Sequence, residues 1–295
     1  MSSVPEQRVF PGWDVEGLCR WLPVTLGLAL MYVPTYIDLA HGLWRQEAHT
    51  HGPIILAVTA WLIWRHRAAL VARPAGGARL AGSVALALGL VLYITGRSQG
   101  IALFEVGSHI PVLGGVVLLL LGWRALGRLW FPLFFLIFLV PLPGFVTVAM
   151  TGPLKSLVAQ GVESMLYGLG YPIARSGMVL SIGQYQMLIA DACSGMNSIY
   201  SLAALGFLYL YLTASRNHAR TALLLASIVP IAFTANFIRV LILILVTFHL
   251  GYDAGQSFFH GSAGMALFVT ALLLLLGFDA LLHRLPPLRG SGALQ

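Results

Sequence analysis

Apolar residues gather in long runs along this chain, and short stretches rich in arginine separate the runs. A helix that crosses the hydrocarbon core of a bilayer needs about 20 predominantly apolar residues. Eight runs approach that length, at residues 21–40, 48–64, 80–96, 104–123, 129–149, 196–213, 221–249 and 262–282. The pattern predicts an all-α polytopic membrane protein with about eight transmembrane helices. Pro141 and Pro143 are expected to kink or end the fifth span.

The charges in the loops orient the predicted spans. Twelve of the 17 Lys and Arg residues fall on one side, namely Arg8, Arg20, Arg65, Arg67, Arg73, Arg79, Arg124, Arg128, Arg216, Arg220, Arg284 and Arg289. Four fall on the opposite side, Arg45, Arg97, Lys155 and Arg175, and Arg239 lies inside the seventh span. Because positive loop residues favour the cytoplasm, both termini are expected there. Residues 1–20 then form a cytoplasmic segment, 21–283 the transmembrane domain and 284–295 a cytoplasmic tail.

Composition supports this class of protein. Hydrophobic residues make up 58% of the chain and charged residues 9%, whereas a soluble domain carries about 25% charged residues. The same balance excludes a disordered chain, which needs low hydrophobicity and high charge. The net charge of +7 is spread over many loops, so we expect no nucleic-acid partner. The N-terminus lacks the pattern of a cleavable signal peptide, and two cysteines do not make a disulfide framework.

One long stretch, residues 150–193, is too polar for a span and falls on the outer side of the predicted topology. Within it, residues 154–168 have apolar positions at helical spacing and suit a helix lying in the membrane interface. Residues 177–190 are rich in β-branched and aromatic residues around Gly183, which predicts a short hairpin or extended segment.

Cys193 lies where this stretch meets the sixth span. A thiol near a helix N-terminus meets the positive end of the helix dipole, which stabilises the reactive thiolate. Asn197 projects from the same helix face four residues later, Ser194 follows the cysteine directly, and Asp191 could orient a partner. The alternative is a small buried apolar residue at a helix start.

Arg239 is the only cation deep in a predicted span, and His260 ends the outer loop before the last span. An arginine facing lipid costs at least ~2.5–3.5 kcal/mol on insertion scales, so Arg239 must face the bundle interior. Asn236, three residues earlier, shares its face. The alternatives are a structural ion pair for Arg239, for instance with Glu105, and an ordinary interfacial histidine for His260.

Three consecutive spans thus deliver a thiol, a guanidinium and an imidazole to the outer half of the membrane. Acyl transfer by cysteine needs a nucleophile, a proton carrier and a cationic donor for the oxyanion, and these three groups supply them. We expect no cofactor and no metal, because His41, His49 and His51 lack the further ligands that zinc requires.

Two other functions remain open on the residues alone. A transporter or channel would use Glu105, His109, Asn236 and Arg239, with Glu105 and His109 pairing on one helix face, but the inverted repeat typical of many transporters is missing. A membrane acyltransferase that uses lipid would leave Cys193 without a clear role.

The sequence also resembles the exosortase/archaeosortase family of membrane transpeptidases. The similar blocks are HGP at 51–53, WLIWRHR at 61–67, FPLFFLIFLVPLP at 131–143, ACSGMNS at 192–198, NFIRV at 236–240 and FHGSAG at 259–264. The cysteine block is the most specific of them. The form HGPI at 51–54 is similar to the bacterial B type, and His51 is added on this basis as a supporting residue.

The resemblance implies an enzyme of the bacterial inner membrane whose active site faces the periplasm. Its substrates would be secreted proteins with a C-terminal tail made of a Pro-Glu-Pro-type motif, a hydrophobic helix and a basic end. Cys193 would form an acyl-thioester, and an unidentified acceptor nucleophile would receive the protein. Arg239 and His260 would complete the site. Descriptions of the family make the arginine the proton donor and the histidine the transition-state stabiliser, whereas the chemistry of the two side chains favours the reverse, so the division of their roles stays open.

Overall fold

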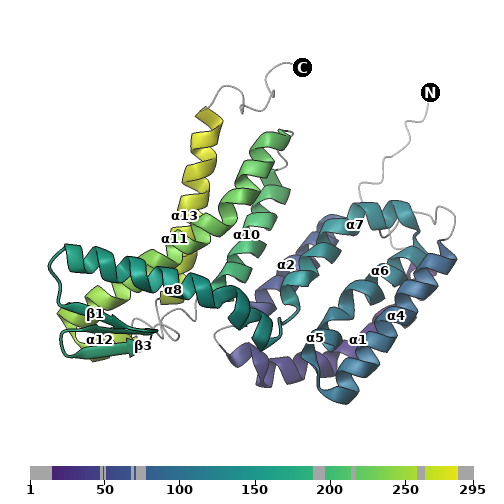
Figure 1. Cartoon of the computed structure of the whole chain (residues 1–295). Helices are drawn as coiled ribbons and strands as arrows, with labels where there is room; N and C mark the ends of the chain where they lie inside the picture. Colours follow the sequence, from purple (N-terminus) through teal and green to yellow (C-terminus); the bar gives the residue numbers. More distant parts are fainter. Residues whose placement is uncertain are drawn as a thin grey trace. The chain divides into compact units, whose positions relative to one another are not determined.

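The computed structural model describes residues 15–46, 49, 51–67, 70, 78–188, 197–213, 217–257 and 263–284. The chain folds into two compact units, Met1–Pro141 and Leu142–Gln295. The described part of the first unit is helical, whereas the second combines helices with a small sheet (Figure 1).

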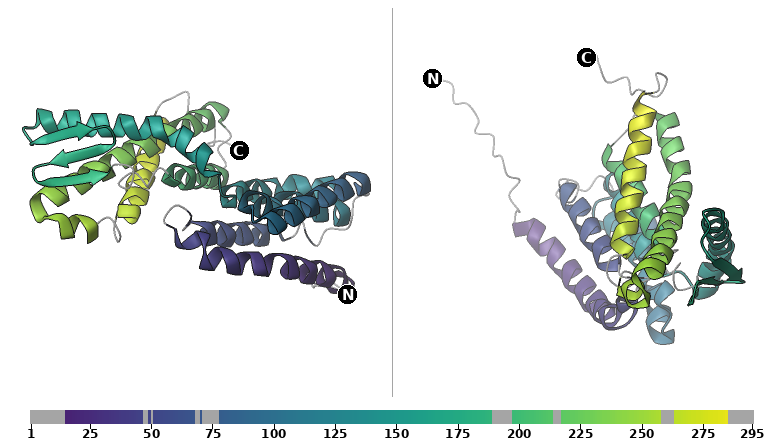
Figure 2. Two further views of the ribbon diagram at one scale, coloured as in Figure 1. Left: turned by 60° about the horizontal axis from the view of Figure 1, so that its bottom comes forward. Right: turned by 90° about the vertical axis from the view of Figure 1, so that its left-hand side faces the viewer.

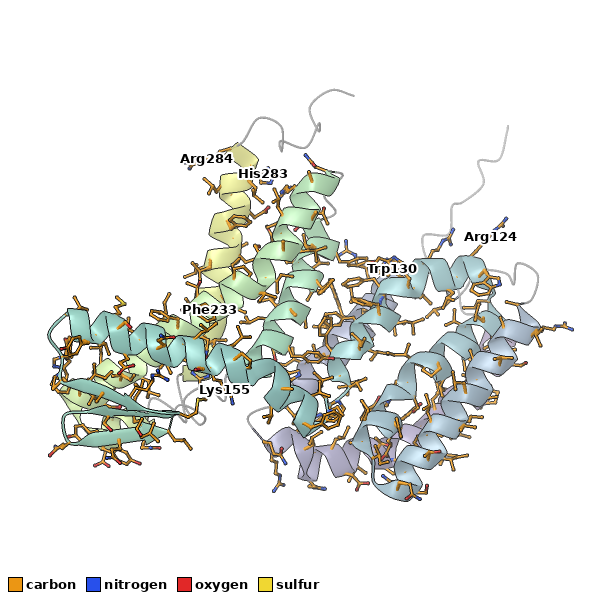
Figure 3. The ribbon with its side chains drawn as sticks, viewed as in Figure 1. Arg124, Trp130, Lys155, Phe233, His283 and Arg284 are labelled. Atoms are coloured by element: carbon orange, nitrogen blue, oxygen red, sulfur yellow. The ribbon has the colours of Figure 1, made fainter. Side chains whose placement is uncertain are left out.

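The first unit contains helices that run through most of its described residues. They are α1 (Val15–His41), η1 (Leu43–Arg45), α2 (Gly52–Arg65), α4 (Arg79–Gln99), α5 (Ala102–Gly107), α6 (His109–Leu120), α7 (Trp123–Phe135) and η3 (Leu136–Leu139). Helix α7 buries Leu129 and Phe131 and exposes Arg124 and Trp130 (Figure 3). Exposed tryptophan and arginine side chains on one apolar helix are typical of a membrane interface.

Helices α4 and α6 approach closely because small residues line their contact. Gly82, Gly89 and Gly96 are buried and recur every seven residues, so they form a single stripe along α4. A Cβ atom at Gly89 would lie 2.8 Å from the backbone nitrogen of Val112, and one at Gly82 would lie 2.9 Å from that of Leu119. The stripe therefore brings the two backbones into direct contact, as small residues do between membrane helices.

We expect Gly89→Ala to lower the free energy of unfolding by about 1–3 kcal/mol, because the added methyl group meets backbone that cannot rotate away. Gly114→Ala on α6 is the matched control, since a Cβ there meets nothing within 4 Å. Thermal unfolding of the purified protein in detergent measures both. Equal melting temperatures for the two variants would contradict this account of the contact.

The second unit begins with a long helix and a three-stranded sheet. Its elements are α8 (Gly144–Gly168), β1 (Ile173–Ser176), β2 (Val179–Ile182), β3 (Tyr185–Leu188), α10 (Asn197–Thr213), α11 (His218–Leu250), α12 (Tyr252–Ser257) and α13 (Ala263–Arg284). The sheet is antiparallel in the order β1-β2-β3. Helix α8 runs across the direction of α13 (Figures 1 and 2).

Helix α11 is the centre of this unit and packs against different partners along its length. Near Leu250, Val240 and Ile244 join a core with α8 and the sheet, in which Val158 and Leu180 are buried. The preceding part of α11 packs on α10 and α13, in a cluster formed by Leu202, Ala232, Ala235, Leu267 and Ala271. An apolar helix surrounded in this way suits a membrane bundle.

The membrane class is supported, but the count of eight spans is not confirmed. Among the described residues, four helices are long and apolar enough to cross a membrane, at Trp21–Arg45, Arg79–Gln99, Ala102–Leu120 and Ala219–Leu250. A fifth is added if Trp123–Leu139 and Gly144–Gly168 form one bent span. Gly52–Arg65 and Tyr200–Thr213 are apolar but shorter.

The break predicted at Pro141 and Pro143 in the fifth span, residues 129–149, is confirmed. The helix changes to a 3-10 turn at Leu136–Leu139 and ends, and α8 starts at Gly144 after Pro141 and Pro143. Proline removes a backbone donor and clashes with the preceding turn, which is the physical reason for the break. The predicted helix at 154–168 is the C-terminal part of α8, and the hairpin predicted at 177–190 is confirmed as β2 and β3.

Candidate active site

Arg239 and Asn236 lie in the interior of the second unit, on the same face of α11. Arg239 is 3% exposed and Asn236 is 1% exposed. They continue the buried stripe of Ala232 and Ala235, because positions three and four apart share a helix face. The prediction that Arg239 faces the protein interior is therefore confirmed, as the cost of placing an arginine in lipid requires.

The packing of α11 on α10 and α13 sets the level of Arg239 in the bundle. Both partners run antiparallel to α11. Leu224 clusters with Leu275 and Leu282 of α13 and with Tyr209 of α10, whereas Ala235 clusters with Leu267 of α13 and Leu202 of α10. Arg239 lies four residues beyond Ala235, which is a rise of about 6 Å towards Leu250. Helix α10 starts five residues before Leu202, and α13 starts four residues before Leu267. Because both helices are antiparallel to α11, their first residues lie about 6–8 Å from these contacts, also towards Leu250. The starts of α10 and α13 are therefore level with Arg239.

The segments that precede these two helix starts carry the other predicted site residues. Cys193, Asp191 and Ser194 belong to residues 189–196, and His260 belongs to residues 258–262, outside the described residues. Asn197 is the first residue of α10. The structure thus describes the positions of Arg239 and Asn236. It also describes the starts of α10 and α13, which directly follow the cysteine and histidine segments.

A buried ion pair holds the opposite end of the same three helices together, and the sequence analysis missed it. The Arg220 guanidinium of α11 donates to Oδ1 of Asp279 on α13 from Nε at 2.8 Å and from Nη2 at 2.6 Å. Tyr209 of α10 also donates to this carboxylate. Both charged side chains are almost fully buried, at 5% and 6% exposure. The signal in the sequence was a single aspartate inside the last apolar run, which requires a partner.

Glu105 and His109 do not pair with each other, which corrects the prediction for this helix face. Oε1 of Glu105 accepts hydrogen bonds from Thr35 at 2.6 Å and from Arg97 at 3.1 Å. The two ring nitrogens of His109 lie 2.7 Å from the Tyr36 hydroxyl and 2.7 Å from the Val106 carbonyl. Partners on α1, α4 and α5 therefore bind both groups within the first unit.

His51 belongs to the first unit and stands directly before α2. Burial, and to a smaller extent the neighbouring His49, lower the pKa of its imidazole to about 4, although a hydrogen bond to the Phe138 backbone acts in the opposite direction. Burial also lowers the pKa of His49. Desolvation disfavours the charged imidazolium, so both histidines are held neutral.

We expect the first unit to lose stability as the pH falls from 6.5 to about 4. In this window the unfolded chain takes up a proton at position 51 that the folded protein does not bind, so the free energy of unfolding decreases as the pH falls. His51→Gln should flatten this dependence, and His49 accounts for part of what remains. Melting temperatures of the two proteins across this pH range are the measurement, and parallel curves would contradict the role given to His51.

Within the described residues, no group of three or more His, Cys, Asp or Glu side chains could hold a metal ion. A comparison with protein families matches residues 43–277 to the transmembrane exosortase family (Exosortase_EpsH). The chain belongs to the transmembrane exosortase family. The match covers most of the chain, from η1 into α13, and includes positions 51, 193, 239 and 260. No curated protein and no solved structure gives a significant match.

Membership of the exosortase family, together with the apolar helices, indicates a multi-pass membrane protein. It also indicates a membrane transpeptidase that is involved in protein sorting. The predicted membership of the exosortase family is thereby confirmed. The roles of the individual site residues remain predictions.

Proposed function

We propose that this exosortase is a cysteine transpeptidase that removes C-terminal sorting tails from secreted proteins at the periplasmic face of the bacterial inner membrane. The substrates carry Pro-Glu-Pro-type tails, and an acceptor nucleophile receives the cleaved protein. The observation that carries the proposal is the burial of Arg239 at the level where α10 and α13 start. The reaction calls for no cofactor, metal or nucleic acid, and the lipid bilayer is the remaining partner.

The length of the chain supports a meeting of the three proposed catalytic groups. Cys193 precedes the start of α10 by four residues, and His260 precedes the start of α13 by three. An extended chain spans at most about 3.3–3.6 Å per residue, so their Cα atoms lie within roughly 14 Å and 11 Å of those helix starts. Both connecting segments are therefore short enough to keep the proposed nucleophile and imidazole close to the helix starts that are level with Arg239.

The chemistry assigns a distinct task to each group. The Cys193 thiolate attacks the carbonyl carbon of the scissile peptide bond, and the Arg239 guanidinium stabilises the oxyanion that forms. Imidazolium at position 260 protonates the leaving amine as the C–N bond breaks, which leaves an acyl-thioester. The neutral imidazole then accepts the proton of the acceptor nucleophile as the thioester breaks and the new acyl bond forms. Arg239 is unsuited to proton transfer because a guanidinium does not deprotonate in proteins.

Supporting roles are proposed for the neighbours of these groups. Asn236 shares the buried face of Arg239 and is proposed to orient it. Asp191, Ser194 and Asn197 flank the nucleophile in sequence, and His51 shapes the start of α2 in the first unit. The transporter alternative gains no support, because Glu105 and His109 form hydrogen bonds within the first unit.

We expect Arg239→Lys to slow loss of the tail by about tenfold or more, although the positive charge is kept. A single ammonium cannot reproduce the planar fork of donors that a guanidinium presents to an oxyanion. The assay co-expresses each variant with a tagged substrate bearing a Pro-Glu-Pro-type tail and follows its shortening on a gel. Arg128→Lys, an exposed change on α7, is the matched control. Cleavage at the wild-type rate by Arg239→Lys would assign Arg239 a structural role only.

A further inference from the structure

The small sheet in the second unit has two edges, and the structure treats them differently. An edge strand presents a row of backbone N–H and C=O groups that can pair with another chain, so proteins usually cover or block it. Strand β1 is one edge and β3 is the other. The sheet lies beside α8, which contacts β1 (Figures 1 and 2).

The register of the two hairpins determines which backbone groups point out of the sheet. Ser176 pairs with Val179 and Ile182 pairs with Tyr185, each across a two-residue turn. Pairs that flank such a turn exchange both hydrogen bonds, and pairing then alternates along the strands. The outward groups are therefore those of Ile173 and Arg175 on β1, and of Gln186 and Leu188 on β3.

The outward donors of β1 are both used within the unit. The backbone N–H of Arg175 donates to Oε1 of Glu163 on α8 at 3.1 Å, and its side-chain Nε donates to Oε2 at 3.0 Å. The backbone N–H of Ile173 donates to the Tyr171 carbonyl at 2.8 Å. The edge at β1 is closed by a hydrogen-bonded ion pair and a tight turn.

On β3 the outward backbone N–H and C=O groups belong to Gln186 and Leu188. In the described part of the chain these groups form no hydrogen bond, in contrast to the outward N–H groups of β1. Both side chains are exposed, Leu188 at 45%. Tyr185 and Met187 point the other way and pack on the core formed with α8 and α11. The edge carries no charge and no proline, which are the usual devices that keep an edge strand from pairing.

We propose that the β3 edge is the docking edge for the substrate, which adds an extended segment to the sheet as a fourth strand. Main-chain hydrogen bonds to Gln186 and Leu188 hold the segment, as in other cases of strand addition. The inference rests on the proposed function, because the chain runs from Leu188 to the proposed nucleophile in five residues. A peptide paired with this edge therefore lies next to the segment that carries Cys193. The occupant is the part of the sorted protein that precedes its hydrophobic tail.

The first test places a photo-cross-linking residue at position 188 or at position 174 of the full-length Cys193→Ala protein. Ala174 lies on the same exposed face of the sheet but on the closed strand, so it is the matched control. The probe is a tagged secreted protein with a Pro-Glu-Pro-type tail, co-expressed in the membrane. We expect a substrate adduct from position 188 and at most a trace from position 174. Equal adducts from both positions, or an adduct between two enzyme chains instead of with the substrate, would overturn the proposal.

The second test changes the substrate and leaves the protein intact. Synthetic peptides that cover the segment before the hydrophobic tail are N-methylated at one residue at a time, and their binding to the Cys193→Ala protein in detergent is measured. Because alternate residues of an added strand face β3, we expect affinity to fall about fivefold at every second residue and little between them. A loss without this two-residue period would contradict strand addition.

These outcomes separate the docking proposal from the proposed function. Both tests use a protein without the nucleophile, so they report binding alone. An adduct at position 188 with no tail loss by the wild-type enzyme would support docking and contradict the transpeptidase. If the wild-type enzyme removes the tail but neither the adduct nor the two-residue period is found, the transpeptidase function is supported and docking at the β3 edge is contradicted.

Discussion

Cys193→Ala is expected to abolish loss of the sorting tail while the protein still folds and inserts. The change removes the sulfur that would form the acyl-thioester, and no second nucleophile is proposed for the reaction. Replacing a thiol by a methyl group removes little volume, so packing should lose only ~1 kcal/mol by analogy with small core truncations. The measurement is the gel assay of the co-expressed tagged substrate, with the melting temperature of the purified variant as a check on folding.

The chain provides its own control for this experiment. Cys19 is its other cysteine and lies in the segment expected in the cytoplasm. Cys19→Ala should therefore process the substrate as the wild type does. Tail loss by Cys193→Ala at the wild-type rate would end the cysteine mechanism and bring the transporter alternative back.

Asp279→Asn is expected to reduce the free energy of unfolding by about 3–5 kcal/mol. The change leaves the Arg220 guanidinium buried between α11 and α13 without a compensating charge, whereas the wild-type carboxylate accepts from it at 2.6 Å. Because Tyr209 of α10 also loses its charged acceptor, all three helices should separate more easily. The same helices place Arg239, so tail loss should fall together with stability. Thermal unfolding in detergent gives the first quantity and the gel assay gives the second.

Two further variants show whether burial is the cause. Asp38→Asn removes a carboxylate that also pairs with an arginine, Arg97, but is 63% exposed, so it should cost less than about 1 kcal/mol. Replacing the buried pair as a whole, with Arg220→Met and Asp279→Leu together, should recover most of the stability lost by Asp279→Asn. A double variant as unstable as the single one would show that the ion pair itself is required.

Hydropathy predicted most helices because membrane helices are long and their apolar character is continuous. At 129–149 the residues stay apolar through the break, so hydropathy alone would continue the helix, and Pro141 and Pro143 supplied the correct prediction that it is interrupted. Hydropathy missed β1, in which Arg175 and Ser176 interrupt the apolar pattern of a strand. That strand forms because its partner β2 and the Glu163 carboxylate supply its hydrogen bonds.

Contacts between side chains that are distant in sequence could not be predicted from the sequence. The partners of Glu105 and His109 on α1 lie 70 and 73 residues away, and those of Arg220 on α13 lie 59 residues away. A local rule of four-residue spacing cannot find such contacts, and it wrongly paired Glu105 with His109. The interior position of Arg239 was predictable because the sequence places it inside a long apolar run, where an arginine that faces lipid would be costly. The site roles of Cys193 and His260 stay predictions.

The central claim, an acyl-thioester on Cys193, is tested most directly by intercepting it. Purified enzyme in detergent is mixed with the tagged substrate in the presence of hydroxylamine, and the mass of the shortened product is measured. Hydroxylamine attacks a thioester carbonyl and displaces the thiolate, so the account predicts a product that ends in a hydroxamate and that is missing with Cys193→Ala. A product that ends only in a carboxylate, formed equally by the wild type and by Cys193→Ala, would contradict it.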